Sequence, residues 1–212
     1  MIEGQHGERG GDPEQLLQEA RRGNPEALGK LLAMYHSYLR LFSRVQIDRR
    51  LQGKADVSDL VQETCALAYD AFEDFRGETE QEFLAWLRQI LISRLARLIR
   101  RYQTQARDVR LERELGEALD RSSVVASEIV SSRSTPSRRA SRREEAVLLA
   151  NAIADLDEVH REIIVLHHFE DLPFGTIAER LGRTEEAVKK LWVRGLAALK
   201  RRIVEHFHGW PE

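Results

Sequence analysis

The 212-residue sequence has few of the features that mark secreted, membrane-spanning or disulfide-bonded proteins. Cys65 is its only cysteine, so no internal disulfide can form, and this usage is typical of a cytosolic protein. No apolar run approaches the length that crosses a bilayer. The opening residues, MIEGQHGERGGDPEQ, hold no apolar segment of the kind found in signal peptides. We therefore expect a cytoplasmic protein with no membrane partner.

The sequence is also poor in motifs that carry catalysis. It has no glycine-rich phosphate loop, no HExxH and no paired-cysteine metal motif. Its densest group of metal-ligating residue types is His167 and His168 with Glu170 and Asp171, but adjacent histidines point to different faces of a helix. We expect no metal site and no cofactor, and we do not expect an enzyme.

What the sequence does have is charge sorted into blocks. The net charge is only −2, yet residues 56–82 hold nine acidic side chains against one arginine. Residues 88–110 reverse this, with seven arginines against one aspartate. Residues 180–202 hold eight basic side chains against two glutamates. Alternating acidic and basic blocks predict two kinds of partner, one basic and one polyanionic.

Apolar residues recur at helical spacing along most of the chain, and no strand-like alternation is present. Asp12 and Asn24, each followed by proline, are predicted helix starts. Ser58 is the predicted cap of the acidic helix, and Gly77 follows the last periodic residue of that segment. The pattern predicts an all-helical protein.

A change of composition divides the helical pattern into two parts. After residue 102 the chain turns polar, with at most a short helix over residues 111–119, and then becomes rich in Ser and Arg. We predict an all-α fold in which two small helical domains are joined by a flexible linker. The first domain spans residues 13–106, the linker 107–143 and the second domain 144–204.

The stretch IAERLGRTEEAVKKLWVRGL, residues 177–196, joins two helical patterns at Gly182. A short helix, a glycine turn and a longer basic helix capped by Thr184 form the pattern of a helix-turn-helix, whose second helix enters the DNA major groove. Trp192 falls on the apolar side, so we assign it to the core. The outward candidates for DNA contact are Arg183, Thr184, Glu185, Glu186, Lys189, Lys190 and Arg194. From this stretch alone, a solvated basic face on an ordinary helical bundle is the alternative interpretation.

The order of these pieces resembles the bacterial RNA polymerase sigma factors of the sigma-70 family, of the compact extracytoplasmic-function (ECF) type. The stretch DVSDLVQETCALAYDAFEDFRGETEQEFLAWLRQILISRLARLIRRY resembles their sigma-two domain. The stretch LDEVHREIIVLHHFEDLPFGTIAERLGRTEEAVKKLWVRGLAALKRRI is similar to their sigma-four helix-turn-helix domain. The resemblance implies a subunit that directs core RNA polymerase to promoters and aids DNA melting at transcription initiation.

The resemblance also implies roles for individual residues. Asp59, Gln62 and Glu63 match the motif that binds the clamp helices of the largest polymerase subunit. The basic helix that follows would recognise and help melt the minus-ten element. Its matching positions are Arg88, Arg94, Arg97, Arg100 and Arg101. The sigma-four residues 183–194 would read the minus-thirty-five element, and that domain would contact the polymerase flap. An anti-sigma factor is a further partner that the resemblance implies.

Other interpretations stay open from the residues alone. The acidic residues of the first domain also fit a solvated helix face with ordinary capping chemistry. A stand-alone helix-turn-helix regulator with a helical N-terminal domain accounts for residues 174–202, but it leaves the acidic helix and the first arginine helix unexplained. A helical scaffold that binds only proteins predicts no strong salt-dependent binding of nucleic acid.

Overall fold

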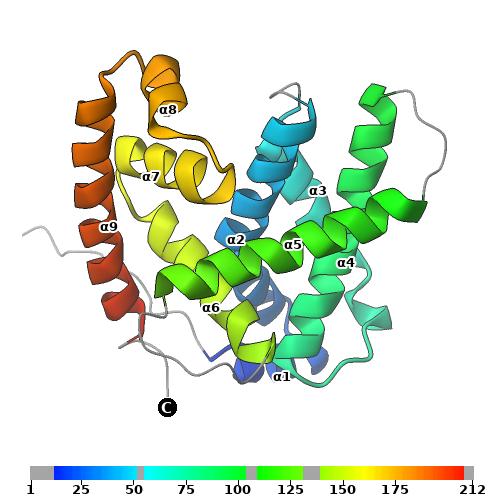
Figure 1. The fold of residues 1–212 in the computed structure, drawn as a ribbon. Helices are drawn as coiled ribbons and strands as arrows, with labels where there is room; N and C mark the ends of the chain where they lie inside the picture. Colours follow the sequence, from blue (N-terminus) through cyan, green and yellow to red (C-terminus); the bar gives the residue numbers. More distant parts are fainter. Residues whose placement is uncertain (1–11, 52–54, 104–108, 131–138, 208–212) are drawn as a thin grey trace, which may run out of the picture.

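The computed structural model describes residues 12–51, 55–103, 109–130 and 139–207. All regular structure in these ranges is helical, which confirms the all-α prediction (Figure 1). The elements are α1 (Pro13–Arg21), α2 (Pro25–Leu51), α3 (Val57–Asp70), η1 (Phe72–Asp74), α4 (Glu80–Gln103), α5 (Val109–Val130), α6 (Arg139–Ala154), α7 (Glu158–Ile164), η2 (Val165–Phe169), α8 (Phe174–Leu181) and α9 (Glu185–Phe207). No helix in the described ranges is long and apolar enough to cross a membrane.

Side-chain caps fix the starts of the first three helices. The Asp12 carboxylate accepts a hydrogen bond from a first-turn N–H at 3.2 Å, and the Asn24 side chain does so at 3.0 Å, so both predicted starts are confirmed. The prediction that Ser58 caps α3 is wrong. Asp56 is the cap, and its carboxylate accepts from the Ser58 N–H at 2.6 Å. The extended backbone of Asp56 lets its short acidic side chain reach that N–H, so the helix begins at Val57.

An aromatic cluster closes the first helical region where α3, η1 and α4 meet. Phe72, Phe75, Phe83 and Trp86 have ring centroids 5.0–6.5 Å apart, and Phe83 is fully buried. Gly77 belongs to this cluster because a Cβ atom there would lie 2.3 Å from the Phe75 ring. The prediction that the acidic helix continues to a break at Gly77 is wrong: α3 ends at Asp70, and the short η1 then carries Phe72 into the core. Phe83 and Trp86 serve as core residues, as their apolar spacing predicted.

A long helix, α5, occupies residues for which the sequence predicts at most a short one. Leu111, Leu115 and Leu119 recur every four residues and are buried against α4 and α6. This apolar stripe stabilises the helix although most of the segment is polar. The helix lies inside the segment predicted as a linker. Residues 131–138, in the middle of that linker, lie outside the described residues.

One continuous hydrophobic core joins the first helical region, residues 13–106, to the second, residues 144–204. It runs from α1 through α6 and includes Leu199 and Ile203 of α9. A smaller cluster within the second region holds α7, η2, α8 and α9 together through Ile163, Ile177 and Val188, among others. The second cluster positions the helix-turn-helix, and the first attaches it to the rest of the chain.

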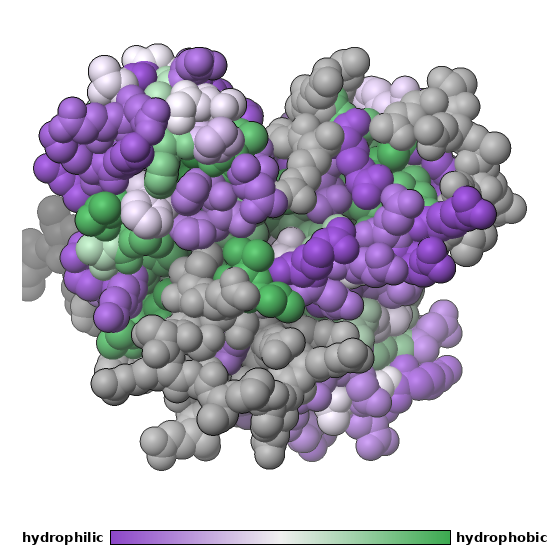
Figure 2. All heavy atoms as spheres, in the orientation of Figure 1, coloured by the Kyte–Doolittle hydropathy of each residue, from purple (hydrophilic) through white to green (hydrophobic). Residues whose placement is uncertain are grey.

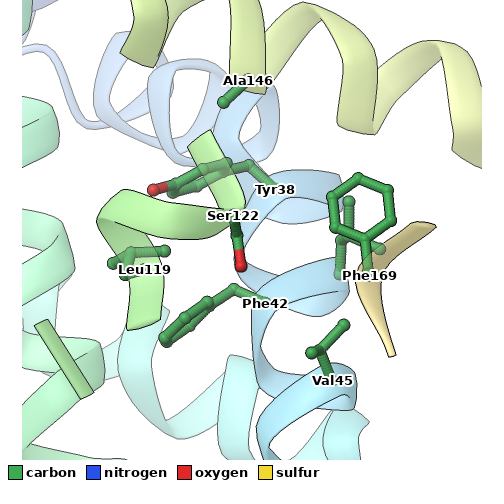
Figure 3. Close-up of a pocket in the computed structure, with 8 residues that line it drawn as sticks. Tyr38, Phe42, Val45, Leu119, Ser122, Ala146 and Phe169 are labelled. Atoms are coloured by element: carbon green, nitrogen blue, oxygen red, sulfur yellow. The ribbon is translucent and has the colours of Figure 1, made fainter. Parts of the chain in front are cut away.

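Side chains from both regions meet around a small apolar pocket (Figure 3). Tyr38 and Phe42 come from α2, Leu119 from α5, Ala146 from α6 and Phe169 from η2. Close by, α2 and α7 are tied by an ion pair between Arg44 and Glu162. The α2, α5, α6 and η2 segments therefore form the junction between the two regions.

Candidate functional site

The residues predicted to bind a basic partner form one exposed face of α3. Asp59, Gln62 and Glu63 are spaced three and four residues apart, so they lie side by side on the helix surface, and all three are exposed. Leu60 and Thr64, on the opposite side, are buried. We call Asp59, Gln62 and Glu63 the α3 acidic face. The structure brings together the three residues that the sequence singled out.

The predicted minus-ten arginines of α4 point in three directions. Arg94 turns toward α3 and pairs with Glu63 at 2.5 Å. Arg100 turns toward α5 and pairs with Glu112 at 3.5 Å. Arg97 and Arg101 are exposed. The set is therefore not a single cationic stripe.

Arg88 differs from the prediction most. The sequence groups it with outward arginines, but its side chain is only 7% exposed. The guanidinium donates to the Tyr38 hydroxyl at 3.1 Å and to the Asp120 carboxylate at 2.5 Å. Arg88 lies on the α4 face that α5 covers, so in this structure it joins α2, α4 and α5 rather than facing solvent.

The α3 acidic face and the arginine helix share a groove. Asp59 and Glu63 line one side, and Arg94, Arg97 and Arg101 line the other. Arg94 and Glu63 form an ion pair across the groove, and Asp59, Arg97 and Arg101 stay exposed to solvent. The sequence assigned these residues to two separate partners and gave no sign that they lie face to face.

The turn between α8 and α9 has the geometry that the sequence predicts. Gly182 has φ +61, in the left-handed region, and ends α8. The N–H of Arg183 then bonds to the Ala178 carbonyl at 2.9 Å, closing the helix end. The Thr184 hydroxyl accepts from the Ala187 N–H at 3.2 Å and starts α9. The predicted glycine turn and threonine cap are both confirmed.

All seven predicted minus-thirty-five residues are exposed around the start of α9. They are Arg183, Thr184, Glu185, Glu186, Lys189, Lys190 and Arg194. Lys189 pairs with Glu185 at 2.5 Å, and Lys190 pairs with Glu186 at 2.7 Å, both one turn apart on the helix. Figure 2 shows hydrophilic side chains gathered over the α8 end of α9. This face offers both hydrogen-bond donors and acceptors at a helix N-terminus, as readout of base edges requires.

An aromatic and imidazole cluster supports α9 from inside. Trp192 stacks on His168, with ring centroids 5.9 Å apart, and its indole N–H donates to His168 Nε2 at 3.1 Å. His167 stacks on Phe174 with centroids 4.2 Å apart. Burial lowers the pKa of His168, and the neighbouring His167 adds to this effect. The two histidines therefore pack as part of the domain, and no group of three metal-ligating side chains occurs within the described part of the chain.

Several polar residues that organise the site carry no motif. Glu112 and Asp120 of α5 bind α4 arginines, and Glu162 binds Arg44 across the junction. Each pair joins residues more than ten positions apart in sequence. The signal that could have revealed Glu112 and Asp120 is their spacing of eight residues, which puts both on one helix face.

Comparisons with known proteins match both helical regions in order. The family model described as "Sigma-70 region 2" matches residues 34–105, and the one described as "Sigma-70, region 4" matches residues 152–201. Together they match more than half of the chain. The first contains α3 and α4, and the second contains the helix-turn-helix.

Relatives are similar to this chain over most of its length. The RNA polymerase sigma factor NccH of Alcaligenes xylosoxydans xylosoxydans is 28% identical over 188 residues, which cover 88% of this chain and 91% of NccH. The ECF RNA polymerase sigma factor BldN of Streptomyces coelicolor is 28% identical over 189 residues, covering 89% of this chain and 65% of BldN. A solved structure of CnrH in complex with the cytosolic domain of CnrY matches with 26% identity and a TM-score of 0.35, over 89% of this chain and 95% of CnrH.

These matches separate the interpretations that the residues alone left open. A stand-alone helix-turn-helix regulator accounts for the region 4 match only, whereas both regions match in the order found in sigma factors. Sigma factors are in general transcription initiation factors rather than catalysts. The chain belongs to the sigma-70 family of RNA polymerase sigma factors, with relatives of the ECF type, and it directs RNA polymerase to promoters.

Proposed function

We propose that the two helical regions divide the work of promoter recognition. Residues 13–106 bind core RNA polymerase and recognise and melt the minus-ten element. Residues 144–204 read the minus-thirty-five duplex, and residues 107–143 connect the two regions. The protein acts in the cytoplasm as a non-catalytic subunit of the polymerase.

One observation carries the assignment of the second region. The Gly182 turn and the Thr184 cap aim the start of α9 outward, and all seven candidate contact residues there are exposed. A recognition helix reads bases through its N-terminal residues, which is where these side chains lie. Arg183 and Arg194 supply cations for phosphates on either side of the two Glu–Lys pairs.

The α3 acidic face supports the assignment of the first region. Its carboxylates are exposed and suit the basic, helical surface expected of polymerase clamp helices. Arg97 and Arg101 border the same groove and are exposed, so they suit the phosphates of a melted strand held next to the clamp. Contact between the second region and the polymerase flap, and control by an anti-sigma factor, stay predictions from the family resemblance.

The test is a pull-down and a run-off assay with purified core polymerase from the source bacterium. We expect stable binding to core and initiation from a subset of genomic promoters. Mapping the start sites then reveals both promoter elements. A folded, inhibitor-free chain that does not bind core would overturn the proposal.

Matched binding assays without polymerase test the two alternatives. A stand-alone regulator selects specific duplex DNA without core, and a protein scaffold binds no nucleic acid in a salt-dependent way. We expect instead that tight, sequence-specific binding requires the complex with core.

A further inference from the structure

Helix α5 crosses α4 over the face that carries two of the five predicted minus-ten arginines (Figure 1). Arg100 meets Glu112 at 3.5 Å, and Arg88 meets Asp120 at 2.5 Å. Between these pairs, Gly116 faces Ile92, where a Cβ atom would be 3.8 Å from the Ile92 side chain. Figure 1 shows α5 crossing in front of α2 and α4. Each of these two acids of α5 thus meets one arginine of α4, and the pairs run in opposite order along the two helices.

Hydrophobic burial keeps α5 in this place. Leu111, Leu115 and Leu119 are buried, and Leu115 and Leu119 are fully so. A third ion pair links Glu114 of α5 to Arg50 of α2 at 3.6 Å. The helix is therefore docked by apolar packing, and its carboxylates are directed at cations of two other helices.

A carboxylate that binds a guanidinium occupies the position that a phosphate oxygen takes in a nucleic-acid complex. While Asp120 and Glu112 hold Arg88 and Arg100, these two arginines cannot neutralise phosphates. Arg97 and Arg101 stay exposed on the neighbouring face. Only part of the cationic surface of α4 is therefore open in the isolated chain.

We propose that α5 masks the minus-ten surface of α4, and that it must move off α4 before Arg88 and Arg100 can contact the melted strand. This inference rests on the proposed role of α4 in binding the minus-ten DNA. In this mechanism Arg97 and Arg101 make the first contacts, and displacement of α5 then adds the other two arginines. The mask keeps the free subunit from binding single-stranded DNA tightly before it joins polymerase.

The experiment measures binding of the full-length protein to a fluorescently labelled 20-nucleotide single strand of mixed sequence, by anisotropy, over a range of salt concentrations. Asp120→Asn and Glu112→Gln each remove one masking charge and keep the side-chain shape. We expect each to tighten binding about three- to tenfold. We expect the double variant to steepen the slope of log K against log salt by about 1.4, which corresponds to two added phosphate contacts at about 0.7 each.

Glu117→Gln is the matched control. It makes the same change of charge on the same helix, but Glu117 pairs with Arg113 of α5 itself, at 3.7 Å, and both side chains are exposed. If Glu117→Gln tightens binding as much as Asp120→Asn, the effect is one of net charge and the mask is refuted. Unchanged binding in all three variants also refutes it.

Hydrogen exchange of the unmodified protein gives a second test that does not depend on variants folding. We expect the amides of α5 to lose protection when the single strand is added, while those of α1 keep theirs. Unchanged protection of α5 in a saturated complex overturns the mask. The run-off assay with core polymerase separates the two ideas, because initiation without any effect at Asp120 leaves the sigma-factor function standing and removes only the mask.

Discussion

The two basic helices, α4 and α9, are built in opposite ways. In α4 three of the five predicted arginines bond to other elements: Arg94 to α3, and Arg88 and Arg100 to α5. In α9 the lysines bond to glutamates of their own helix, one turn away, and stay exposed. A cation paired within its own helix is ready to bind DNA, whereas one paired across helices is also part of the fold. The same charge change should therefore affect binding alone in α9, and both binding and stability in α4.

The largest effect is expected from reversing charge on α9. Lys189→Glu combined with Lys190→Glu places four adjacent acids at the start of the recognition helix. We expect promoter-dependent transcription to fall more than about 100-fold, or about 2.8 kcal/mol at about 1.4 kcal/mol per tenfold change. The free energy of unfolding should change by less than about 1 kcal/mol, since the positions are exposed. Run-off transcription and denaturant unfolding measure the two quantities.

Binding of this variant to core polymerase is the control. We expect its affinity for core to equal that of the unmodified protein, because the α3 acidic face is untouched. An equal loss of core binding would show that the two surfaces do not have separate roles.

The next largest effect is expected in the stability of α4. Arg88→Ala removes a buried guanidinium and leaves the Tyr38 hydroxyl and the Asp120 carboxylate without it. We expect the free energy of unfolding to fall by about 2 kcal/mol, below the 3–5 kcal/mol of a fully buried pair because Asp120 is itself well exposed. Arg97→Ala, on the same helix but exposed, should change it by less than about 0.5 kcal/mol. Urea unfolding of both variants makes the comparison, and equal losses would contradict the division within α4.

What the sequence predicted well depends on residues close together in the chain. Gly182 and Thr184 act on neighbours within four or five residues, so their types and spacing determine the turn and the start of α9. The exposure of Lys189 and Lys190 follows equally from helical periodicity. The α3 acidic face was named from the family resemblance, and its three residues lie within one turn of a single helix.

What the sequence did not predict depends on pairs far apart in the chain. Arg88 and Asp120 are 32 positions apart, and no local pattern shows that they meet. The length of α5 was underestimated because its apolar stripe is sparse, and its helix is stabilised by α4 and α6 rather than by its own composition. The pairing of Glu63 with Arg94, 31 positions apart, was also missed. The sequence assigned Glu63 to the polymerase and Arg94 to DNA, so nothing linked the two residues.

Because Glu63 pairs with Arg94, substitutions in the α3 acidic face also test whether the arginines of α4 are held by other helices. We expect Asp59→Ala combined with Glu63→Ala to weaken binding to core polymerase about tenfold, since rim and partly exposed charges contribute modestly. Glu63→Ala alone also releases Arg94, so it should raise affinity for single-stranded DNA, whereas Asp59→Ala should not. Titration against core and against a labelled single strand measures both effects. If the double variant binds core normally, the α3 acidic face is only a solvated surface.

The smallest effect is expected from pH, and it concerns the support beneath α9. His168 accepts the Trp192 indole N–H at Nε2, which requires a neutral ring at that nitrogen, and burial lowers its pKa. The unfolded chain then takes up a proton at a higher pH than the folded one, so stability rises with pH in this range. The contribution is complete above the ordinary histidine pKa of about 6.5 and is lost as the pH falls from there through the lowered folded-state pKa. Asp171 opposes the shift, since its charge favours the protonated ring.

His168→Gln keeps an acceptor for Trp192 but does not titrate. Thermal unfolding of both proteins between pH 7.5 and pH 5.5 should therefore show a steeper decline for the unmodified chain, and parallel curves would mean that His168 does not stabilise α9 through its neutral form.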